Sequence, residues 1–170
     1  MDTNFPEIPE YIRKMMESGE ELDEIRIDAD GNWFHNGVAF KNKKLITFFN
    51  KSIDLTKDKL YVVSYSGFVY PIIVEDVPLF VTGIRFAKDG DADCVYLALT
   101  SGETEKLDID TLYYKNNALY CLVKKGKFPA KFKRSPCYEI LQNIKDTDDI
   151  YFLEICGKRI VLSEKMDAHD

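Results

Sequence analysis

The sequence of 170 residues lacks the short motifs that mark known catalytic sites. The phosphate loop GxxxxGK[ST], the nucleophile motif GxSxG, the zinc motif HExxH and the dinucleotide motif GxGxxG are all missing. Of the two histidines, His169 lies in a polar tail, which leaves His35 as the histidine to consider. The missing motifs favour a protein without catalytic activity, and we expect no cofactor.

Long hydrophobic runs are also missing. Runs such as YPIIV at 70–74 and VYLAL at 95–99 are far shorter than the roughly 20 residues that span a bilayer. The opening MDTNFPEIPE has no basic-then-apolar pattern of a signal peptide. A net charge of −6 argues against a general nucleic-acid binder. We therefore expect a cytoplasmic protein with no membrane span.

Paired metal-binding or redox motifs are missing as well. The four cysteines form no CxxC pair, which predicts buried, reduced thiols and no zinc site. The acidic loops at 28–32 and 89–93 imitate calcium sites, but neither has glycine at the sixth position of an EF-hand loop. We interpret both loops as turns and expect no metal.

The residues that are present predict an α+β protein with a packed core, since 45% of them are hydrophobic and 13% aromatic. Helices are expected at 9–19, ending at Gly19, at 42–52, capped by Asn42, and at 136–145, with Ser135 as cap and Pro136 in the first turn. Short strand patterns fill the rest. Turns between them are predicted at Asp30-Gly31, Ser66-Gly67 and Gly126.

The two halves of the chain resemble one motif used twice. Sliding the sequence on itself by 90 residues aligns Lys41 with Lys131, Lys43 with Lys133, Lys44 with Arg134 and Gly67 with Gly157. The order of elements is the same in both copies: strand, basic strand, helix, strand, glycine turn, strand. We expect two packed, related halves with a repeated strand–helix–strand motif. The expected parts are a helix and linker at 1–24, an N-terminal domain at 25–82 and a C-terminal domain at 83–170.

Positive charge is concentrated in two windows of this acidic chain. Residues 31–53 contain four lysines and no acid, and residues 111–138 contain seven basic residues and no acid. In the strand pattern KFPAKFK, lysines alternate with Phe128, Ala130 and Phe132 and therefore share one face. Pro129 suggests that this strand is an edge or carries a bulge, because proline cannot donate to a sheet ladder.

These basic residues have two interpretations. Lysines on an edge strand discourage aggregation without binding anything. Alternatively, cations from both copies line one cleft and hold a small anionic ligand, since Lys131 and Lys133 would stand about 7 Å apart and Arg134 could add a bidentate donor.

Two stretches resemble signatures of a bacterial domain-of-unknown-function family. Residues 30–40, DGNWFHNGVAF, match D-G-x-W-x-H-x-G, and residues 74–80, VEDVPLF, match V-E-D-x-P-[LF]-F. The strand–basic–aromatic–helix segment at 119–141 extends the likeness, which covers nearly the whole chain from Ile25. Lys41 departs from the family pattern, which has arginine there, and LYVVSYSGFVYPI is a looser version of its segment.

This resemblance implies an α+β fold with an internal duplication and a C-terminal half superficially like a pleckstrin-homology domain. It also implies a site between the halves for a nucleotide-like ligand, and a role in signalling. The family has no established reaction. The expected helix at 136–145 departs from the pleckstrin pattern, because it precedes the last two strands instead of ending the domain.

Four further residues are candidates for the same site. Trp33, the only tryptophan, could stack on a base or fill the core. His35 could bind phosphate or be hydrogen-bonded structurally. Glu75 and Asp76 follow an apolar strand and could orient bases or hydroxyls, or pair with Lys41 or Lys131.

Taken together, the sequence predicts a non-catalytic sensor or adaptor that binds a phosphate-bearing, nucleotide-like ligand and has a signalling partner. Its predicted ligand-binding residues are Trp33, His35, Lys41, Lys43, Glu75, Asp76, Lys131, Lys133 and Arg134. One alternative is a protein-interaction module that uses exposed strand edges and the aromatics Tyr113, Tyr114 and Phe132. Another is a hydrolase or transferase centred on His35 and Glu75.

Overall fold

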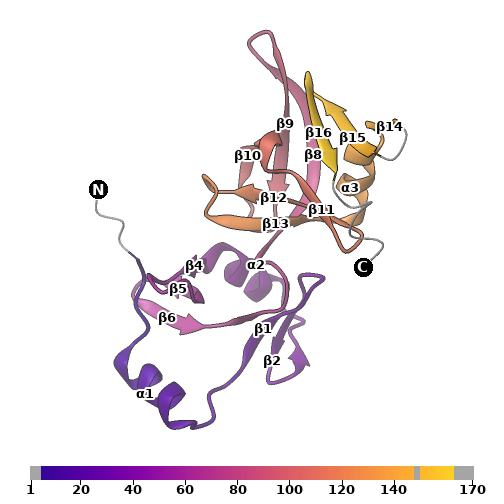
Figure 1. Ribbon diagram of the computed structural model, residues 1–170. Coiled ribbons are helices and arrows are strands. Elements are labelled where there is room, and N and C mark those ends of the chain that lie inside the picture. Colours follow the sequence, from indigo (N-terminus) through magenta and orange to yellow (C-terminus); the bar gives the residue numbers. More distant parts are fainter. Residues whose placement is uncertain (1–4, 148–149, 163–170) are drawn as a thin grey trace. The chain divides into compact units, whose positions relative to one another are not determined.

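The computed structural model describes residues 5–147 and 150–162, which form two compact units divided between Pro78 and Leu79 (Figure 1). The described residues form three α-helices and sixteen strands in four sheets, so the predicted α+β class is confirmed. The boundary expected after residue 82 falls inside the first strand of the second unit. The polar tail that contains His169 lies outside the described residues.

The first unit contains two small sheets and two helices. Strands β3-β2-β1-β7 form one sheet, in which β7 runs parallel to β1, and β4-β5-β6 form an antiparallel sheet. The elements are α1 (Glu10–Ser18), β1 (Ile25–Ile27), β2 (Trp33–His35), β3 (Val38–Ala39), α2 (Lys43–Ser52), β4 (Ile53–Leu55), β5 (Tyr61–Tyr65), β6 (Phe68–Pro71) and β7 (Ile73–Val74).

Local signals set the ends of these elements. Gly19 ends α1 with a left-handed φ of 75°, as predicted. The side chain of Asn42 accepts hydrogen bonds from the N–H groups of Lys44 and Leu45, which confirms it as the cap of α2. Ser66 and Gly67 both have positive φ, which makes the turn between β5 and β6 the tight two-residue type that the sequence predicts.

A small apolar cluster holds α1 against the β5–β6 hairpin. Ile8 and Ile12 pack with Val62 and Val69, and all four side chains are buried. Ile12 is the buried residue of α1, whereas Met15 is half-buried and Met16 is 43% exposed. The apolar side chains of this helix are therefore only partly covered.

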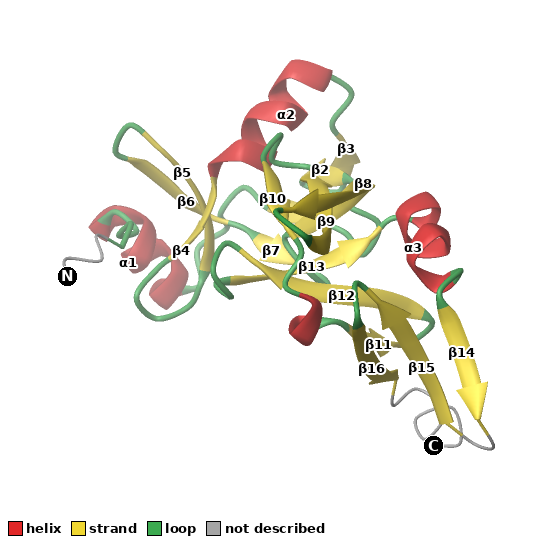
Figure 2. Ribbon diagram, turned by 90° about the horizontal axis from the view of Figure 1, so that it is seen from above, coloured by secondary structure: helices red, strands yellow, loops and turns green. Residues whose placement is uncertain are grey.

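The second unit is built on a six-stranded sheet of order β10-β9-β8-β13-β12-β11, followed by a separate antiparallel sheet β14-β15-β16 (Figure 2). Helix α3 packs against β8 and β13. The elements are β8 (Leu79–Asp89), β9 (Ala92–Leu99), β10 (Thr104–Lys106), the 3₁₀ turn Ile109–Thr111, β11 (Tyr113–Lys115), β12 (Ala118–Val123), β13 (Phe128–Phe132), α3 (Arg134–Leu141), β14 (Ile144–Thr147), β15 (Ile150–Ile155) and β16 (Lys158–Leu162).

Two sequence predictions about this unit are wrong. Strand β13 is not an edge strand, because it pairs with β12 on one side and runs parallel to β8 on the other. Pro129 is tolerated there because the pairing with β8 begins one residue later, at Ala130. Helix α3 starts at Arg134, earlier than expected, and its N-cap is Lys133, which makes no side-chain capping hydrogen bond; Ser135 is not the cap.

The same succession of elements occurs in both units. A hairpin leads into a helix and then into a three-stranded antiparallel sheet, as β2–β3, α2 and β4–β6 in the first unit and as β12–β13, α3 and β14–β16 in the second. The last turn is alike in both: Cys156 and Gly157 have positive φ, as Ser66 and Gly67 do. The first hairpins differ, since two residues join β2 to β3 and four join β12 to β13.

Candidate functional site

The first basic segment lies at the start of α2. Lys41 follows the short strand β3, and Lys43 and Lys44 occupy the first turn of the helix. All three side chains are exposed, and no ion pair involves any of them within residues 5–147 and 150–162. The helix N-terminus adds a partial positive charge, so this end of α2 favours an anion.

An aromatic cluster lies one helical turn further along α2. Phe48 is 38% exposed and follows Lys44 by four residues, which puts the two side chains on the same side of the helix. The ring of Phe48 meets that of Tyr65 edge-to-face, with centroids 5.0 Å apart, at the end of the β5–β6 hairpin. The first unit therefore offers exposed cations next to an exposed ring.

The second basic segment runs from β13 into α3, and aromatic rings support its lysines. The register of the sheet aligns Tyr113, Tyr120, Lys131 and Phe80 in one row across four strands. The ammonium group of Lys131 lies 5.9 Å from the ring centroid of Tyr120, and that of Lys133 lies 4.6 Å from Phe80. The predicted alternation is confirmed, because Phe128, Ala130 and Phe132 are all buried on the opposite face.

Arg134 and Tyr138 complete this segment on α3. Arg134 is the first residue of the helix, and its guanidinium carbon lies 5.9 Å from the ring centroid of Tyr138. Tyr138 is 58% exposed. Arg134 and Tyr138 have the same spacing as Lys44 and Phe48. Each helix therefore begins with a cation followed, four residues later, by an exposed aromatic ring.

Trp33 lies in the core, which is the alternative that the sequence left open beside stacking on a ligand. Its side chain is 1% exposed and its indole N–H donates to Asn50 Oδ1 at 2.8 Å. The indole also stacks on Phe49 of α2, with ring centroids 5.2 Å apart. The buried indole N–H has its acceptor, and neither face of the ring is open to a ligand. Trp33 therefore attaches α2 to the β2–β3 hairpin.

His35 lies in an exposed polar cluster with Asp23 and Asn36. Its Nε2 is 3.6 Å from Asp23 Oδ2, and the Asn36 amide donates to Asp23 Oδ1 at 3.2 Å. The hydrogen bond from Asn36, followed by that from His35, lowers the pKa of Asp23. The Asn36 N–H donates to the Glu24 carbonyl at 2.8 Å and the Asn36 side-chain Oδ1 accepts from the Glu24 N–H at 2.7 Å, which fixes the cluster at the end of β2.

Glu75 pairs with Arg26, a residue that the sequence analysis did not single out. Arg26 on β1 donates through Nε to Glu24 Oε1 at 2.8 Å and through Nη1 to Glu75 Oε1 at 3.4 Å. The hydrogen bond from Arg26 lowers the pKa of Glu24. Asp76 is exposed beside this pair. His35 is joined to Asp23 and Glu75 to Arg26, and within the described residues no hydrogen bond or ion pair joins His35 to Glu75.

The remaining predictions concern thiols, metals and exposed aromatics. All four cysteines are free; Cys94 and Cys121 are buried, whereas Cys137 and Cys156 are half-buried, so burial was predicted correctly for two of them. Phe132 is 4% exposed and so is wrong as an exposed contact residue. In the described part of the chain no group of three metal-ligating side chains occurs. No helix there is long and apolar enough to cross a membrane.

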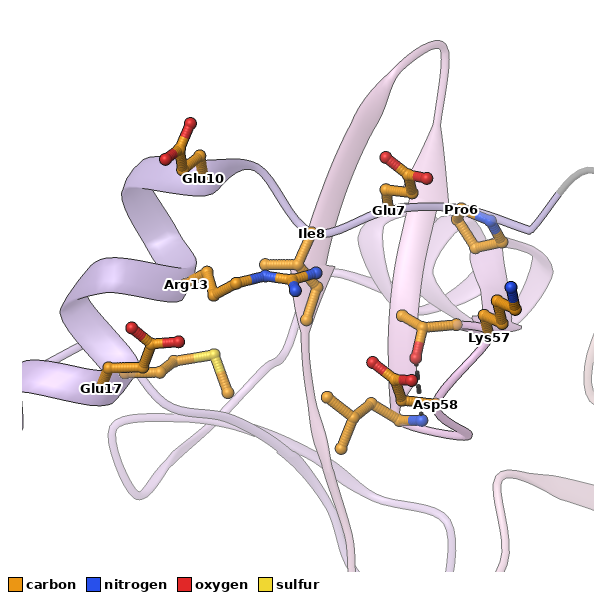
Figure 3. Close-up of a pocket in the computed structure, with 11 residues that line it drawn as sticks. Pro6, Glu7, Ile8, Glu10, Arg13, Glu17, Lys57 and Asp58 are labelled. Carbon is orange, nitrogen blue, oxygen red and sulfur yellow. Dashed lines mark hydrogen bonds between the residues drawn. The ribbon is translucent and has the colours of Figure 1, made fainter.

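The sequence analysis missed the groove beside α1. It has a volume of about 750 Å³ and lies between α1, the extended segment Pro6–Ile8 and the turn between β4 and β5 (Figure 3). That turn is closed by a hydrogen bond from the Leu60 N–H to Thr56 Oγ1 at 3.0 Å. Charged side chains from all three segments line the groove, and Arg13 extends from α1 into it (Figure 3).

Comparisons with known proteins identify the fold. No family model matches this chain, and no curated protein matches it. A DUF1285 family protein from Silicibacter pomeroyi DSS-3 is similar in structure, with a TM-score of 0.65 and 16% identity over 85% of this chain and 83% of that one. A DUF1285 family protein from Shewanella baltica OS155 has a TM-score of 0.57 and 19% identity over 71% of this chain and 92% of that one. At these identities the likeness is one of fold.

Proposed function

We propose that this protein binds a phosphate-bearing, nucleotide-like ligand without transforming it and acts as a sensor or adaptor in signalling. The observation that carries the proposal is that α2 and α3 each begin with a cation followed, four residues later, by an exposed aromatic ring, Lys44 with Phe48 and Arg134 with Tyr138. A cation is suited to phosphate, and an exposed ring beside it is suited to the flat face of a base.

The second unit supplies the stronger phosphate contacts in this proposal. Lys131 and Lys133 rest on aromatic rings, so their side chains lose less freedom when they bind than unsupported lysines would. Arg134 follows at the start of α3, whose first turn has no side-chain cap, so its N–H groups add to the attraction for an anion. Lys41, Lys43 and Lys44 play the same part in the first unit.

We also infer that the chain belongs to the DUF1285 family. The sequence signatures at 30–40 and 74–80 and the fold shared with two DUF1285 proteins support this inference. We propose that the succession of elements common to both units arose by duplication. The pleckstrin-like character of the second unit and the signalling role rest on the family resemblance alone.

A thermal-shift screen tests the ligand class. The panel contains inorganic phosphate, pyrophosphate, sugar phosphates, nucleoside mono-, di- and triphosphates and cyclic dinucleotides. A ligand at 100 times its Kd should stabilise the fold by about 2.7 kcal/mol, which for a chain of this size is about 5–10 °C in Tm. No shift with any member of the panel would contradict the proposal.

Matched variants then locate the site. Arg134→Ala should weaken binding of the active compound by about tenfold or more, because it removes a charged hydrogen bond to phosphate. Lys115→Ala is the control, since Lys115 is an exposed cation of the same unit on the far strand of the sheet, β11. Equal losses in the two variants would show that binding follows net charge and does not use the start of α3.

One observation favours a second candidate, a protein-interaction module. Strand β11 is an edge of the six-stranded sheet and carries Tyr113, which is 37% exposed and stacks on Tyr120. An edge strand with an exposed tyrosine can receive an added strand from a partner. Specific capture of one protein that is lost in Tyr113→Ala, together with no response to the small-molecule panel, would favour this candidate.

A further inference from the structure

The groove beside α1 continues into a second hollow of the first unit. The second hollow has a volume of about 290 Å³ and is lined mainly by apolar side chains, among them Leu22, Ile25 and Ile72. Met16 and Leu60 line both hollows, so the two are joined at these side chains. They are 43% and 45% exposed, so apolar surface is open to solvent where the two hollows meet. The result is an elongated surface with an apolar middle.

The charges along the larger hollow are not balanced. Its lining contains two cations, Arg13 and Lys57, and four carboxylates, which are Glu7, Glu10, Glu17 and Asp58. Glu10 is paired with Lys14, at 3.6 Å. Within the described ranges 5–147 and 150–162, no ion pair joins Glu7, Glu17 or Asp58 to a cation. The lining therefore has an excess of two negative charges, and Glu7, Glu17 and Asp58 are exposed on it.

We propose that this groove binds a basic, amphipathic peptide segment of a partner protein. Apolar side chains of the peptide would cover Met16 and Leu60, and its lysines or arginines would face Glu7, Glu17 and Asp58. An elongated groove with an apolar centre and a charged rim is the arrangement that receives an amphipathic helix or extended peptide. The excess of carboxylates on the rim disfavours anionic lipid surfaces and nucleic acid by repulsion.

This site is separate from the one proposed for a phosphate-bearing ligand. The groove uses α1, the segment before it and the β4–β5 turn, whereas the proposed phosphate contacts lie at the starts of α2 and α3. The two sites also require opposite charges in their ligands. A failure of one proposal therefore leaves the other unaffected.

The test uses two fluorescein-labelled 14-residue peptides with leucine at helical spacing. One peptide carries lysine at all of the remaining positions, and the second carries glutamate at those positions. Fluorescence anisotropy with the full chain should show binding of the leucine–lysine peptide that weakens as salt is raised. No binding of this peptide would overturn the proposal, and equal or tighter binding of the leucine–glutamate peptide would overturn it as well.

Charge variants place the binding in the groove. Glu17→Lys should weaken the binding of the leucine–lysine peptide at least fivefold, because it replaces an attraction between opposite charges by a repulsion between like charges. Glu139→Lys is the control, since Glu139 is an exposed glutamate on α3 and the substitution changes the net charge by the same amount. An equal loss in both variants would overturn the proposal by showing that only net charge matters.

An apolar variant tests the centre of the groove. Leu60→Ser should weaken the binding of the leucine–lysine peptide at least threefold, while Val161→Ser on β16 should leave this binding unchanged. Both side chains are largely exposed, at 45% and 62%, so neither change should disturb folding, which circular dichroism will check. Unchanged binding by folded Leu60→Ser would overturn the assignment.

Discussion

The two basic segments of this protein occupy the same place in the succession of elements but are supported differently. In the first unit, Lys41, Lys43 and Lys44 stand exposed around the start of a helix that Asn42 caps. In the second unit, Lys131 and Lys133 rest on the rings of Tyr120 and Phe80, and the helix start has no side-chain cap. Within the part of the chain that the structure describes, similar sequence patterns thus give exposed cations without ring contacts in one unit and cations held over aromatic rings in the other.

The difference has a structural cause. The hairpin of the second unit pairs with β8 and becomes the middle of a six-stranded sheet, so Lys131 lies on a broad sheet face among aromatic residues. In the first unit, β3 is two residues long and is the edge of its sheet, so Lys41 falls beyond the strand. The surroundings of a basic segment therefore decide whether its cations are oriented in advance.

The anchoring of the two helices also differs and gives the largest expected effect. Ile140 of α3 is 0% exposed, and Ile140→Ala should destabilise the second unit by about 2–5 kcal/mol because it leaves a cavity. Alkylation of Cys121 measures this, since the thiol is fully buried and burial raises its pKa to about 12. Alkylation no faster than in the wild type would show that α3 does not depend on this contact.

Asn50 stands at the matching place in α2, where the contact is polar. Asn50→Leu should destabilise the first unit by about 1–3 kcal/mol, because the buried indole N–H of Trp33 loses its acceptor. Denaturant unfolding followed by the fluorescence of Trp33, the only tryptophan, reports this change directly. An unchanged or increased stability of Asn50→Leu would contradict this, and would mean that α2 can be held by an apolar contact like that of Ile140 in α3.

The exposed rings of the two helices can be compared through ligand binding. Tyr138→Ala and Phe48→Ala should each weaken the binding of an active nucleotide by about 1–3 kcal/mol, the usual contribution of a base stacked on a ring. The same variants should leave inorganic pyrophosphate unaffected, since it has no base. Isothermal titration with both compounds makes the comparison. Equal losses for pyrophosphate would assign the rings a structural role.

The smallest effect concerns the hairpin turn of the first unit. Asn36 lowers the pKa of Asp23 and has a φ of 47°, so Asn36→Gly removes the side chain without straining the turn. The pKa of Asp23 should then rise toward its ordinary value, as followed by NMR titration. A lowered pKa in the folded state contributes stability at pH values above the pKa of the unfolded chain. This stability is lost as pH falls through the folded-state pKa, so the variant should lose less stability in acid than the wild type. An unchanged pKa would contradict the assignment.

The sequence predicted those parts of the fold that depend on local chemistry. Gly19, Asn42 and the Ser66-Gly67 turn were recognised because a left-handed φ or a helix cap needs a particular residue type at that position. The alternation of lysine with Phe128, Ala130 and Phe132 was also correct, because it depends only on the period of a strand.

The errors concern neighbours that are distant in sequence. Pro129 suggested an edge strand, but β8, some 50 residues earlier, lies beside β13. Likewise the hydrogen bond between Trp33 and Asn50 and the ion pair between Glu75 and Arg26 are contacts that no local sequence pattern specifies. The groove beside α1 was missed because α1, the Pro6–Ile8 segment and the β4–β5 turn come together only in the folded unit.

The central claim is that the start of each helix binds the phosphate and base of one class of ligand. The most direct test is an NMR titration of isotope-labelled protein with pyrophosphate, ADP, GMP and a cyclic dinucleotide. We predict that the backbone amides of Lys44, Arg134 and Ser135 respond to at least one compound, together with the ring signals of Phe48 and Tyr138 for those that carry a base. Amides and rings that remain unchanged with every compound would contradict the claim.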